Sequence, residues 1–403
     1  MENILIWGTG KRARDAYRHL RWYTKQYKVV AFGDNAKEKV GQIFCGKSVI
    51  GAGELSEYHS LDCIVIASSA QKEIKLQLME IVRIPIYESI DSLIFTRATV
   101  DISGFCNAKC KWCVTGQRNC RQKVIDLKKY MSFELFDKIY ANLTEKQIIS
   151  PETELMLYSW GEPLLNPDYL KIINFLAKKG QKYSVSTNAS KAVCAKRKNV
   201  FQNCVNYTIS MPGFSQQSYD KIHELRFESV KENIKCLVKD LRYGGFHGDA
   251  SISYHVYKFN MDEIKEAVKF AEELGIRVMA YYPYFNGISM ACRYLEGNMN
   301  QEELKQIDAE MELSHVEGLL AARPEEYHCF LENILSIDYQ GNLTLCCASD
   351  DECDDYLWES VDTINSLQDM WRTRSKQLVS ATCQRCRNNH IDYWIGNNPL
   401  YTL

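Results

Sequence analysis

The chain has 403 residues, which is more than one hydrophobic core usually supports, so two or three domains are expected. Its 49 Lys and Arg residues nearly balance 51 Asp and Glu residues, and the net charge is −2. This balance argues against a polycationic surface, and hence against nucleic acid as a partner. The N-terminus shows no secretion signal, and no run of about 18 apolar residues could insert into a membrane, so we expect a cytoplasmic protein.

Sixteen cysteines in such a chain favour metal binding over disulfides, because the cytosol keeps thiols reduced. Several lie outside any ligand-like spacing, and we expect these to be small hydrophobic core residues. They are Cys45, Cys63, Cys194, Cys204 and Cys236.

Residues 1–95 show the pattern of a nucleotide-binding half-sheet. A buried strand at 3–7 is followed by the turn Gly8-Thr9-Gly10 and by a helix that reaches about residue 27. Gly8 and Gly10 would let the backbone approach a phosphate at the N-terminus of that helix. A second strand at 29–33 ends at Asp34, whose carboxylate can bond a ribose hydroxyl. We also predict strands at 61–68 and 84–87 and a helix at 71–81.

This first segment resembles small Rossmann-like domains attached to sugar-modifying enzymes, which implies a nucleotide or a nucleotide sugar as its ligand. The alternative is a degenerate module that only packs or dimerises. In that case Asp34 simply caps the next turn.

Residues 96–290 alternate between strand and helix patterns. Six such units predict an α/β fold, with a parallel sheet curved into a partial (β/α)6 TIM-like barrel. A barrel of this kind presents its chemistry at the C-terminal ends of the strands. The predicted strands are 98–102, 155–158, 183–186, 206–210, 251–256 and 277–281, and the predicted helices are 131–143, 169–179, 191–201, 228–241 and 261–274.

Three cysteines follow the first of these strands, at spacings of four and three residues: Cys106, Cys110 and Cys113. Three thiolates on one short loop can hold three corners of a [4Fe-4S] cluster. The fourth iron would then be open to a substrate or cofactor. A zinc knuckle, or three ordinary buried cysteines, is the alternative.

The cysteine spacing, with Trp112 just before the last cysteine, resembles the signature of the radical S-adenosylmethionine (SAM) superfamily. The turn that contains Gly161, Glu162 and Pro163 is similar to the family's Gly-Gly-Glu-Pro motif, which holds the SAM amino group, with Trp160 in place of the first glycine. The resemblance implies reductive cleavage of SAM to a 5′-deoxyadenosyl radical that abstracts a substrate hydrogen. It also implies a flavodoxin-type or ferredoxin-type electron donor. Further SAM contacts implied by the resemblance are Trp112 against adenine, the triplet Ser186, Thr187 and Asn188, and Ser210.

Residues near the last barrel strands are candidates for proton or hydrogen transfer. They are His255, Tyr282, Tyr284 and Cys292. The alternative for His255 is an interior histidine with satisfied hydrogen bonds. Cys120 lies too far from the loop to be a cluster ligand in this pattern.

Residues 291–403 are predicted to begin with a linker helix at 301–317 and to contain a hairpin at 334–345 that turns at 340–342. The hairpin would bring Cys329 near Cys346, and Cys383 and Cys386 could complete a four-thiolate site. The arrangement resembles the SPASM/twitch extension of radical SAM enzymes. Asp392 stands where the full SPASM form has its next cysteine, so we expect the shorter, twitch-like form with one auxiliary [4Fe-4S] cluster.

Two alternatives remain for this second site. Zinc also suits four thiolates. Cys347 or Cys353 could replace one of the four ligands, although adjacent Cys346 and Cys347 on a strand would point in opposite directions, so that only one should face the site.

The implied enzyme is an oxidoreductase or epimerase. Enzymes of this extended type modify either peptides or small polyols and sugars, and peptide maturases commonly carry a winged-helix segment where this chain has a Rossmann-like module. We therefore expect a carbohydrate substrate, either free or linked to a nucleotide or carrier, that undergoes dehydrogenation, epimerisation or deoxygenation. A maturase of ribosomally made peptides is the alternative enzyme, and a non-catalytic cluster-binding scaffold or sensor is the alternative of another class.

Overall fold

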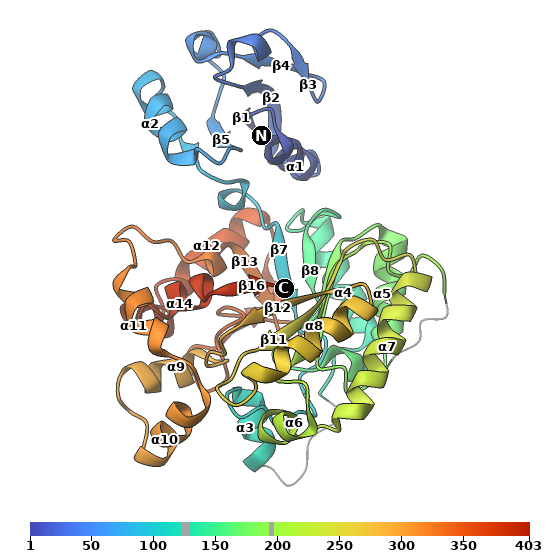
Figure 1. Cartoon of the computed structure of the whole chain (residues 1–403). Helices are drawn as coiled ribbons and strands as arrows, with labels where there is room; N and C mark the ends of the chain where they lie inside the picture. Colours follow the sequence, from blue (N-terminus) through green and yellow to red (C-terminus); the bar gives the residue numbers. More distant parts are fainter. Residues whose placement is uncertain (122–128, 193–196) are drawn as a thin grey trace. The chain divides into compact units, whose positions relative to one another are not determined.

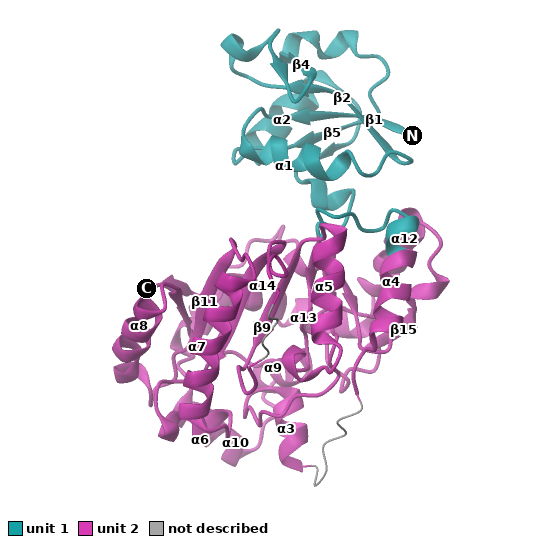
Figure 2. Cartoon of the chain, turned by 90° about the vertical axis from the view of Figure 1, so that its right-hand side faces the viewer, with its two compact units in different colours: residues 1–96, 143–153 teal, residues 97–142, 154–403 magenta. Residues whose placement is uncertain are grey.

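The computed structural model describes residues 1–121, 129–192 and 197–403. The chain divides into two compact units, shown in Figures 1 and 2, of which the first comprises residues 1–96 and 143–153 and the second residues 97–142 and 154–403. The predicted division into three domains, with a separate module at 291–403, stays a prediction. Over the described ranges we find no helix with the length and apolarity that a membrane crossing requires.

The first unit is built on a six-stranded sheet in the order β3-β4-β2-β1-β5-β6. β1 (Glu2–Trp7) pairs in parallel with both β2 (Tyr27–Gly33) and β5 (Cys63–Ile66). The apolar run of β1 is buried, and Leu5 and Trp7 join a hydrophobic core with Ile74 and Leu78 of helix α2 (Gln71–Ile81). The edges are β4 (Lys47–Ile50) with β3 (Ile43–Phe44) on one side and β6 (Ile86–Tyr87) on the other.

Two features of the first unit differ from the prediction. The helix after the glycine turn, α1 (Lys11–Leu20), ends at Leu20 because the following amides, Trp22 N and Tyr23 N, bond to carbonyls three residues back. The short strands β3 and β4 were not indicated by the pattern, since strands of two and four residues carry little periodicity.

The second unit contains a ten-stranded mixed sheet whose central six strands are parallel and follow chain order. Successive parallel strands need crossover connections, and helices supply most of them here, as predicted. The strands are β7 (Arg97–Val100), β8 (Glu154–Met156), β9 (Tyr183–Thr187), β10 (Cys204–Met211), β11 (Asp249–His255) and β12 (Arg277–Tyr281), and the main helices between them are α4 (Phe133–Glu145), α5 (Tyr169–Lys179), α7 (Phe227–Tyr243) and α8 (Ile264–Glu273).

The described residues of the predicted helix at 191–201 are not helical. Residues 193–196 and the Cys194 thiol lie outside the described part, and residues 197–203 form a bend and turns. The prediction did not include two shorter helices, α3 (Val114–Arg121), which follows β7, and α6 (Gln216–Ile222), which follows β10.

The C-terminal residues extend this sheet at both edges. β13 (Ile334–Ile337) pairs in parallel with β7, and β14 (Asn342–Thr344) and β15 (Leu357–Ser360) continue outward as antiparallel strands. β16 (Leu400–Thr402) pairs with β12 at the other edge. The predicted hairpin is confirmed, with Gly341 at a φ of +86° and the Asp338 carboxylate accepting bonds from Gln340 N and Asn342 N.

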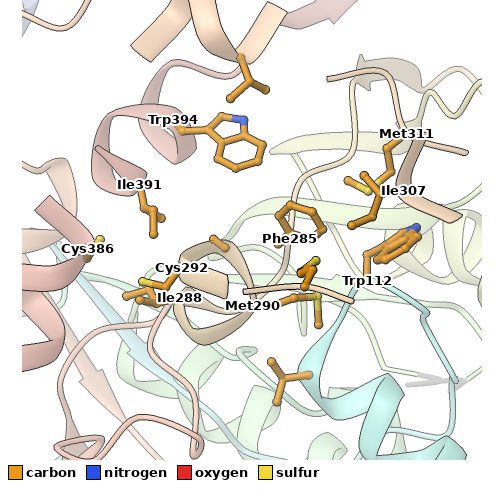
Figure 3. Close-up of a cluster of buried hydrophobic side chains, with 14 of the residues drawn as sticks. Trp112, Phe285, Ile288, Met290, Cys292, Ile307, Met311, Cys386, Ile391 and Trp394 are labelled. Atoms are coloured by element: carbon orange, nitrogen blue, oxygen red, sulfur yellow. The ribbon is translucent and has the colours of Figure 1, made fainter. Parts of the chain in front are cut away.

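Helices from the same region enclose a hydrophobic cluster, of which Figure 3 shows Trp112, Phe285 and Trp394. The predicted helix at 301–317 is two helices, because Met311 leaves the helical conformation and is buried in this cluster. The helices are α9 (Ile288–Leu295), α10 (Gln301–Glu310), α11 (Ser314–Ala321), α12 (Leu367–Gln377), α13 (Ala381–Asn388) and α14 (Ile391–Asn397).

Candidate active site

A cavity of about 450 Å³ lies in the second unit, and residues at or just beyond the C-terminal ends of β8 to β12 contribute to its wall. Most of the predicted site residues meet there. They are Cys106, Cys110, Trp112, Cys113, Gly161, Glu162, Ser186, Thr187, Asn188, Ser210 and His255.

Helix α3 holds the loop of three cysteines in place. Asn119 donates from Nδ2 to the carbonyls of Cys106 (2.7 Å) and Ala108 (2.8 Å). A side chain at Gly116 would lie 2.2 Å from the Cys110 carbonyl oxygen, so only glycine allows the helix to pack this closely on the loop. The cysteine spacing alone does not indicate either residue. In the sequence, the signal that could have indicated them was a glycine three positions after Cys113 and an asparagine six positions after it.

The three thiols form a suitable donor set for an iron-sulfur cluster. Burial, together with the neighbouring ionisable groups, raises the pKa of Cys106 and of Cys110. Amide groups point at two of the sulfurs, since Asn188 Nδ2 lies 3.5 Å from Cys106 Sγ and Asn286 Nδ2 lies 3.5 Å from Cys113 Sγ. Soft thiolates and such polar neighbours suit a cluster.

The site does not suit a single metal ion. Across the described residues, no set of three or more His, Cys, Asp and Glu side chains is placed to hold one ion. A four-iron cluster is wider than one ion, so its thiolate ligands stand further apart. The fit to a cluster therefore rests on the chemistry of the three thiols and on their shared cavity.

The turn that contains Gly161 packs directly on the start of the cysteine loop. A side chain at Gly161 would lie 1.4 Å from the Ser103 carbonyl oxygen, and Glu162 N donates to the Phe105 carbonyl (2.8 Å). Asp101, at the end of β7, accepts a bond from Trp160 N (3.0 Å). Burial raises the pKa of Asp101 to about 7. The sequence pattern did not indicate this buried carboxyl, which fixes the turn relative to the cysteine loop.

Trp160, which replaces the first glycine of the motif, is accommodated without strain. Its indole Nε1 donates to the Ser349 carbonyl (3.0 Å), and its ring packs partly buried against the hydrophobic cluster of Figure 3. The larger side chain thus ties the turn to the segment that carries Cys346 and Cys347.

The Glu162 carboxylate joins two of the predicted motifs. It accepts bonds from Thr187 Oγ1 (2.6 Å), Asn188 N (2.7 Å) and Leu164 N (3.0 Å). The side chain is buried, and burial raises its pKa to about 7. Pro163 does not line the cavity; it is buried as the first residue of a 3-10 turn, Pro163–Leu165, where its fixed φ is favourable.

The residues of the polar triplet, 186–188, differ in what their side chains contact. The Thr187 hydroxyl donates to Glu162 Oε1 and accepts from Ala189 N. The Asn188 side chain accepts from Ser190 N and donates from Nδ2 to Asn107 Oδ1 (3.2 Å). Ser186 and Ser210 line the cavity without such roles in the loops. Trp112 lines the cavity as well, but it is only 6% exposed and packs edge-on against Phe285.

Only some of the catalytic candidates line the large cavity. His255 lines the cavity, and its Nε2 shares a 2.7 Å hydrogen bond with the Tyr281 hydroxyl. Burial lowers the pKa of His255 to about 4. Tyr284 also lines the cavity. Tyr282 and Cys292 are not among the lining residues: the Tyr282 ring lies 5.1 Å from the His315 ring, and Cys292 is fully buried in the hydrophobic cluster of Figure 3.

A second, smaller cavity of about 30 Å³ is lined by four cysteines. They are the predicted set, Cys329, Cys346, Cys383 and Cys386. Cys383 and Cys386 lie three residues apart on α13 and so share one helix face. Asp392 lines the same cavity.

The two neighbouring cysteines at the end of β14 face different cavities. Cys346 lines the four-cysteine cavity and Cys347 lines the larger one. The two side chains diverge as predicted, but β14 ends at Thr344 and Cys347 lies in a turn, so the alternation of a strand is not the cause. Cys353 is among the lining residues of neither cavity.

In the first unit, the predicted nucleotide-binding residues have local partners. Gly8 has a φ of +127°, and a side chain there would lie 2.8 Å from the Ala67 carbonyl oxygen, so this glycine is needed for packing against the end of β5. Gly10 has open space around it. Burial alone would raise the pKa of Asp34, but bonds from Thr9, Ala36 N and Lys39 hold it below its usual value. Asp34 thus caps the following turn, as the alternative interpretation expected.

Two protein-family models match parts of the chain. Residues 100–291 match the family model "Radical SAM superfamily", and residues 1–90 match "C2185-like, N-terminal". None of the curated proteins compared with the chain matches it.

Three solved structures illustrate the similarity. BtrN in complex with AdoMet and 2-DOIA is 12% identical, covers 76% of this chain and 90% of its own, and has a TM-score of 0.38. anSMEcpe with bound AdoMet is 12% identical, with coverages of 72% and 81% and a TM-score of 0.44. Streptococcus suis SuiB bound to S-adenosylmethionine is 13% identical, with coverages of 67% and 62% and a TM-score of 0.41.

Proposed function

Because residues 100–291 form a radical SAM superfamily domain, we propose that the protein cleaves SAM reductively and uses the resulting radical on a carbohydrate, free or linked to a nucleotide or carrier. The central sheet of the second unit would then be the partial barrel of such an enzyme. One observation carries the proposal. The three loop cysteines, the Gly161 turn, and the side chains of Ser186 and Ser210 line a single cavity.

The chain's own residues have distinct tasks in this proposal. Cys106, Cys110 and Cys113 would hold the cluster, which supplies the electron that breaks a carbon-sulfur bond of SAM. Glu162 keeps the Gly161 turn and the loop after β9 in register through its three accepted bonds. Ser186 and Ser210 offer hydroxyls to the polar parts of SAM.

The remaining wall of the cavity suits a substrate rich in hydroxyl groups. It presents neutral groups that can both donate and accept hydrogen bonds, since burial keeps His255 neutral near pH 7. Arg97, at the start of β7, lines the cavity as a cation, which would suit a phosphate on a linked sugar. The neutral polar groups are Thr99, Tyr158, Ser253, His255 and Tyr281.

The four-cysteine cavity is the proposed site of an auxiliary [4Fe-4S] cluster, in a twitch-like C-terminal module. The support is that all four predicted cysteines line one small cavity. An auxiliary cluster can accept the electron of the substrate radical, which would favour dehydrogenation over epimerisation.

The first unit is proposed to be a Rossmann-like module. Its parallel strands reverse their order around β1, with the Gly8 turn at the C-terminal end of that strand. Since Asp34 is engaged with Thr9 and Lys39, a nucleotide there would have to be held by the turn and the N-terminus of α1.

The test is an anaerobic assay of protein reconstituted with iron and sulfide, with SAM and dithionite, against panels of free sugars, nucleoside-diphosphate sugars and peptides. We expect a sugar to stimulate 5′-deoxyadenosine formation, and a deuterated sugar to pass deuterium into it. The product mass then separates dehydrogenation, epimerisation and deoxygenation. Stimulation by peptides alone would favour a peptide maturase. Absence of 5′-deoxyadenosine from an iron-loaded protein would favour the scaffold.

The opposite orientation of Cys346 and Cys347 predicts a clear difference between two neighbouring variants. Cys346→Ala should lose the auxiliary cluster's share of the bound iron, because it removes one of the four cavity thiols. Cys347→Ala should keep the wild-type iron content, because this thiol faces the other cavity. Iron analysis after anaerobic reconstitution measures both. Equal iron loss in the two variants would contradict the assignment.

The partly buried position of His255 predicts an acid-sensitive stability. The pKa of histidine is about 6.5 in an unfolded chain, and burial lowers it to about 4 in the folded protein. As pH falls between these values, only the unfolded chain gains the proton, so the free energy of unfolding should fall, by up to about 3 kcal/mol. Denaturant unfolding at pH 7 and pH 5 should show a smaller loss in His255→Gln. Identical losses in variant and wild type would refute this.

A further inference from the structure

A buried arginine stands at the wall of the four-cysteine cavity. Arg374, on helix α12, lines this cavity together with all four thiols and is only 3% exposed. Its guanidinium donates to the carbonyls of Leu331 (2.8 Å), Glu332 (2.8 Å) and Leu345, and to Gln377 Oε1 (3.0 Å). Every one of these acceptors is neutral.

The other charges at this cavity are paired. Arg387 lies 2.6 Å from the Glu332 carboxylate, and Arg323 lies 3.6 Å from the Asp392 carboxylate. Within the described ranges, no carboxylate forms an ion pair with Arg374. Arg323 lies outside the cavity wall, and when it is counted the charged groups at and around the cavity sum to one positive charge in excess. The buried Arg374 shares the wall with the four thiols.

A buried charge without a counter-charge is unfavourable, even when its hydrogen bonds are satisfied. The arrangement becomes favourable if the cavity holds an anion. Four thiolates around an iron-sulfur cluster carry a net negative charge, and that charge grows by one when the cluster takes up an electron. A nearby fixed cation favours whichever form is more negative, because the attraction is strong in a low-dielectric site.

We infer that Arg374 is the built-in counter-ion of an anionic iron-sulfur centre in the four-cysteine cavity, and that it makes this centre easier to reduce. The inference rests on the auxiliary cluster of the proposed function. One electron enters the centre, and no bond forms or breaks there. In the proposed dehydrogenation that electron leaves a substrate radical carbon that bears a hydroxyl group, which becomes a carbonyl as its proton passes to water.

Arg374 also holds backbone segments in position, and this role must be distinguished from the effect of its charge. Its bonds reach the carbonyls of residues just after Cys329 and just before Cys346, so it joins two of the segments that carry the thiols. A purely structural role would alter iron loading with any substitution. A charge role would alter the reduction potential only when the charge is removed.

The experiment uses the full chain with Cys106, Cys110 and Cys113 replaced by alanine, so that only the auxiliary centre gives a signal. In this background, Arg374→Gln removes the charge and Arg374→Lys keeps it. Arg372→Gln is the matched control, because Arg372 lies on the same helix with its side chain 78% exposed. Iron content and an anaerobic redox titration followed by electron paramagnetic resonance are measured for each protein.

We expect Arg374→Gln to lower the midpoint potential so that reduction by a given mediator is at least about tenfold less favourable, a shift of about 59 mV for one electron. Arg374→Lys and Arg372→Gln should stay near the parent protein. An iron-loaded Arg374→Gln protein with an unchanged potential would overturn the inference. So would loss of iron in both Arg374 variants, since the forked hydrogen bonds rather than the charge would then matter. A parent protein without any iron would instead contradict the auxiliary cluster itself.

Discussion

Cys106→Ala is expected to abolish 5′-deoxyadenosine formation from SAM in the anaerobically reconstituted protein. Cys106 is one of three thiols that face the large cavity, and its carbonyl and sulfur are both held by other residues of the site. Removing an outer-sphere partner of a metal site lowers activity by up to about 100-fold. Loss of a cluster ligand itself should therefore lower activity by more than that.

The matched control is Cys120→Ala. Cys120 lies on the same helix that supports the loop, but its side chain is exposed and it is absent from the cavity wall. This variant should keep both the iron and the activity of the wild type. A Cys106→Ala protein that still forms 5′-deoxyadenosine at the wild-type rate would exclude this loop as the site of SAM cleavage.

Gly161→Ala is expected to destabilise the second unit severely. The new methyl group would lie 1.4 Å from the Ser103 carbonyl oxygen and 2.9 Å from the Phe105 carbonyl oxygen, both of which are backbone atoms. The turn would have to move away from the cysteine loop and would break the bonds from Trp160 N and Glu162 N. We expect a cost of about 3 kcal/mol or more in the free energy of unfolding.

Gly318→Ala provides the same substitution with the opposite expectation. Gly318 lies inside α11, and a side chain there would meet nothing within 4 Å. Alanine should therefore stabilise the helix by about 0.5–1 kcal/mol. Denaturant unfolding of the two variants and of the wild type measures both effects. Equal midpoints for Gly161→Ala and the wild type would show that the turn does not pack on the loop as described.

The sequence predicts the elements of both sheets well where the pattern is long and locally determined. Helix α2, helix α5 and strand β12 have the predicted limits, because each combines a clear periodicity with flanking turn residues. The break between α10 and α11 could not be predicted. It depends on Met311 entering a core whose other members come from distant segments.

The candidate site was predictable as a set of motifs but not as a network of contacts. That Cys346 and Cys347 would face different directions was predicted from the period of two along a strand, but β14 ends at Thr344, so their divergence comes from the turn that follows. Spacing could not show that Cys292 is enclosed in a hydrophobic cluster while His255 reaches the cavity, since both facts depend on packing between distant elements. Nor could it show that the Glu162 carboxylate is bonded to the loop after β9.

The central claim is that three thiolates leave one iron of a cluster free to bind SAM. The most direct test is electron paramagnetic resonance of the reduced protein with Cys329, Cys346, Cys383 and Cys386 replaced by alanine, recorded with and without SAM. We predict an iron-loaded protein whose cluster signal changes when SAM is added. A signal that SAM leaves unchanged, or a protein that holds zinc at this loop, would contradict the account.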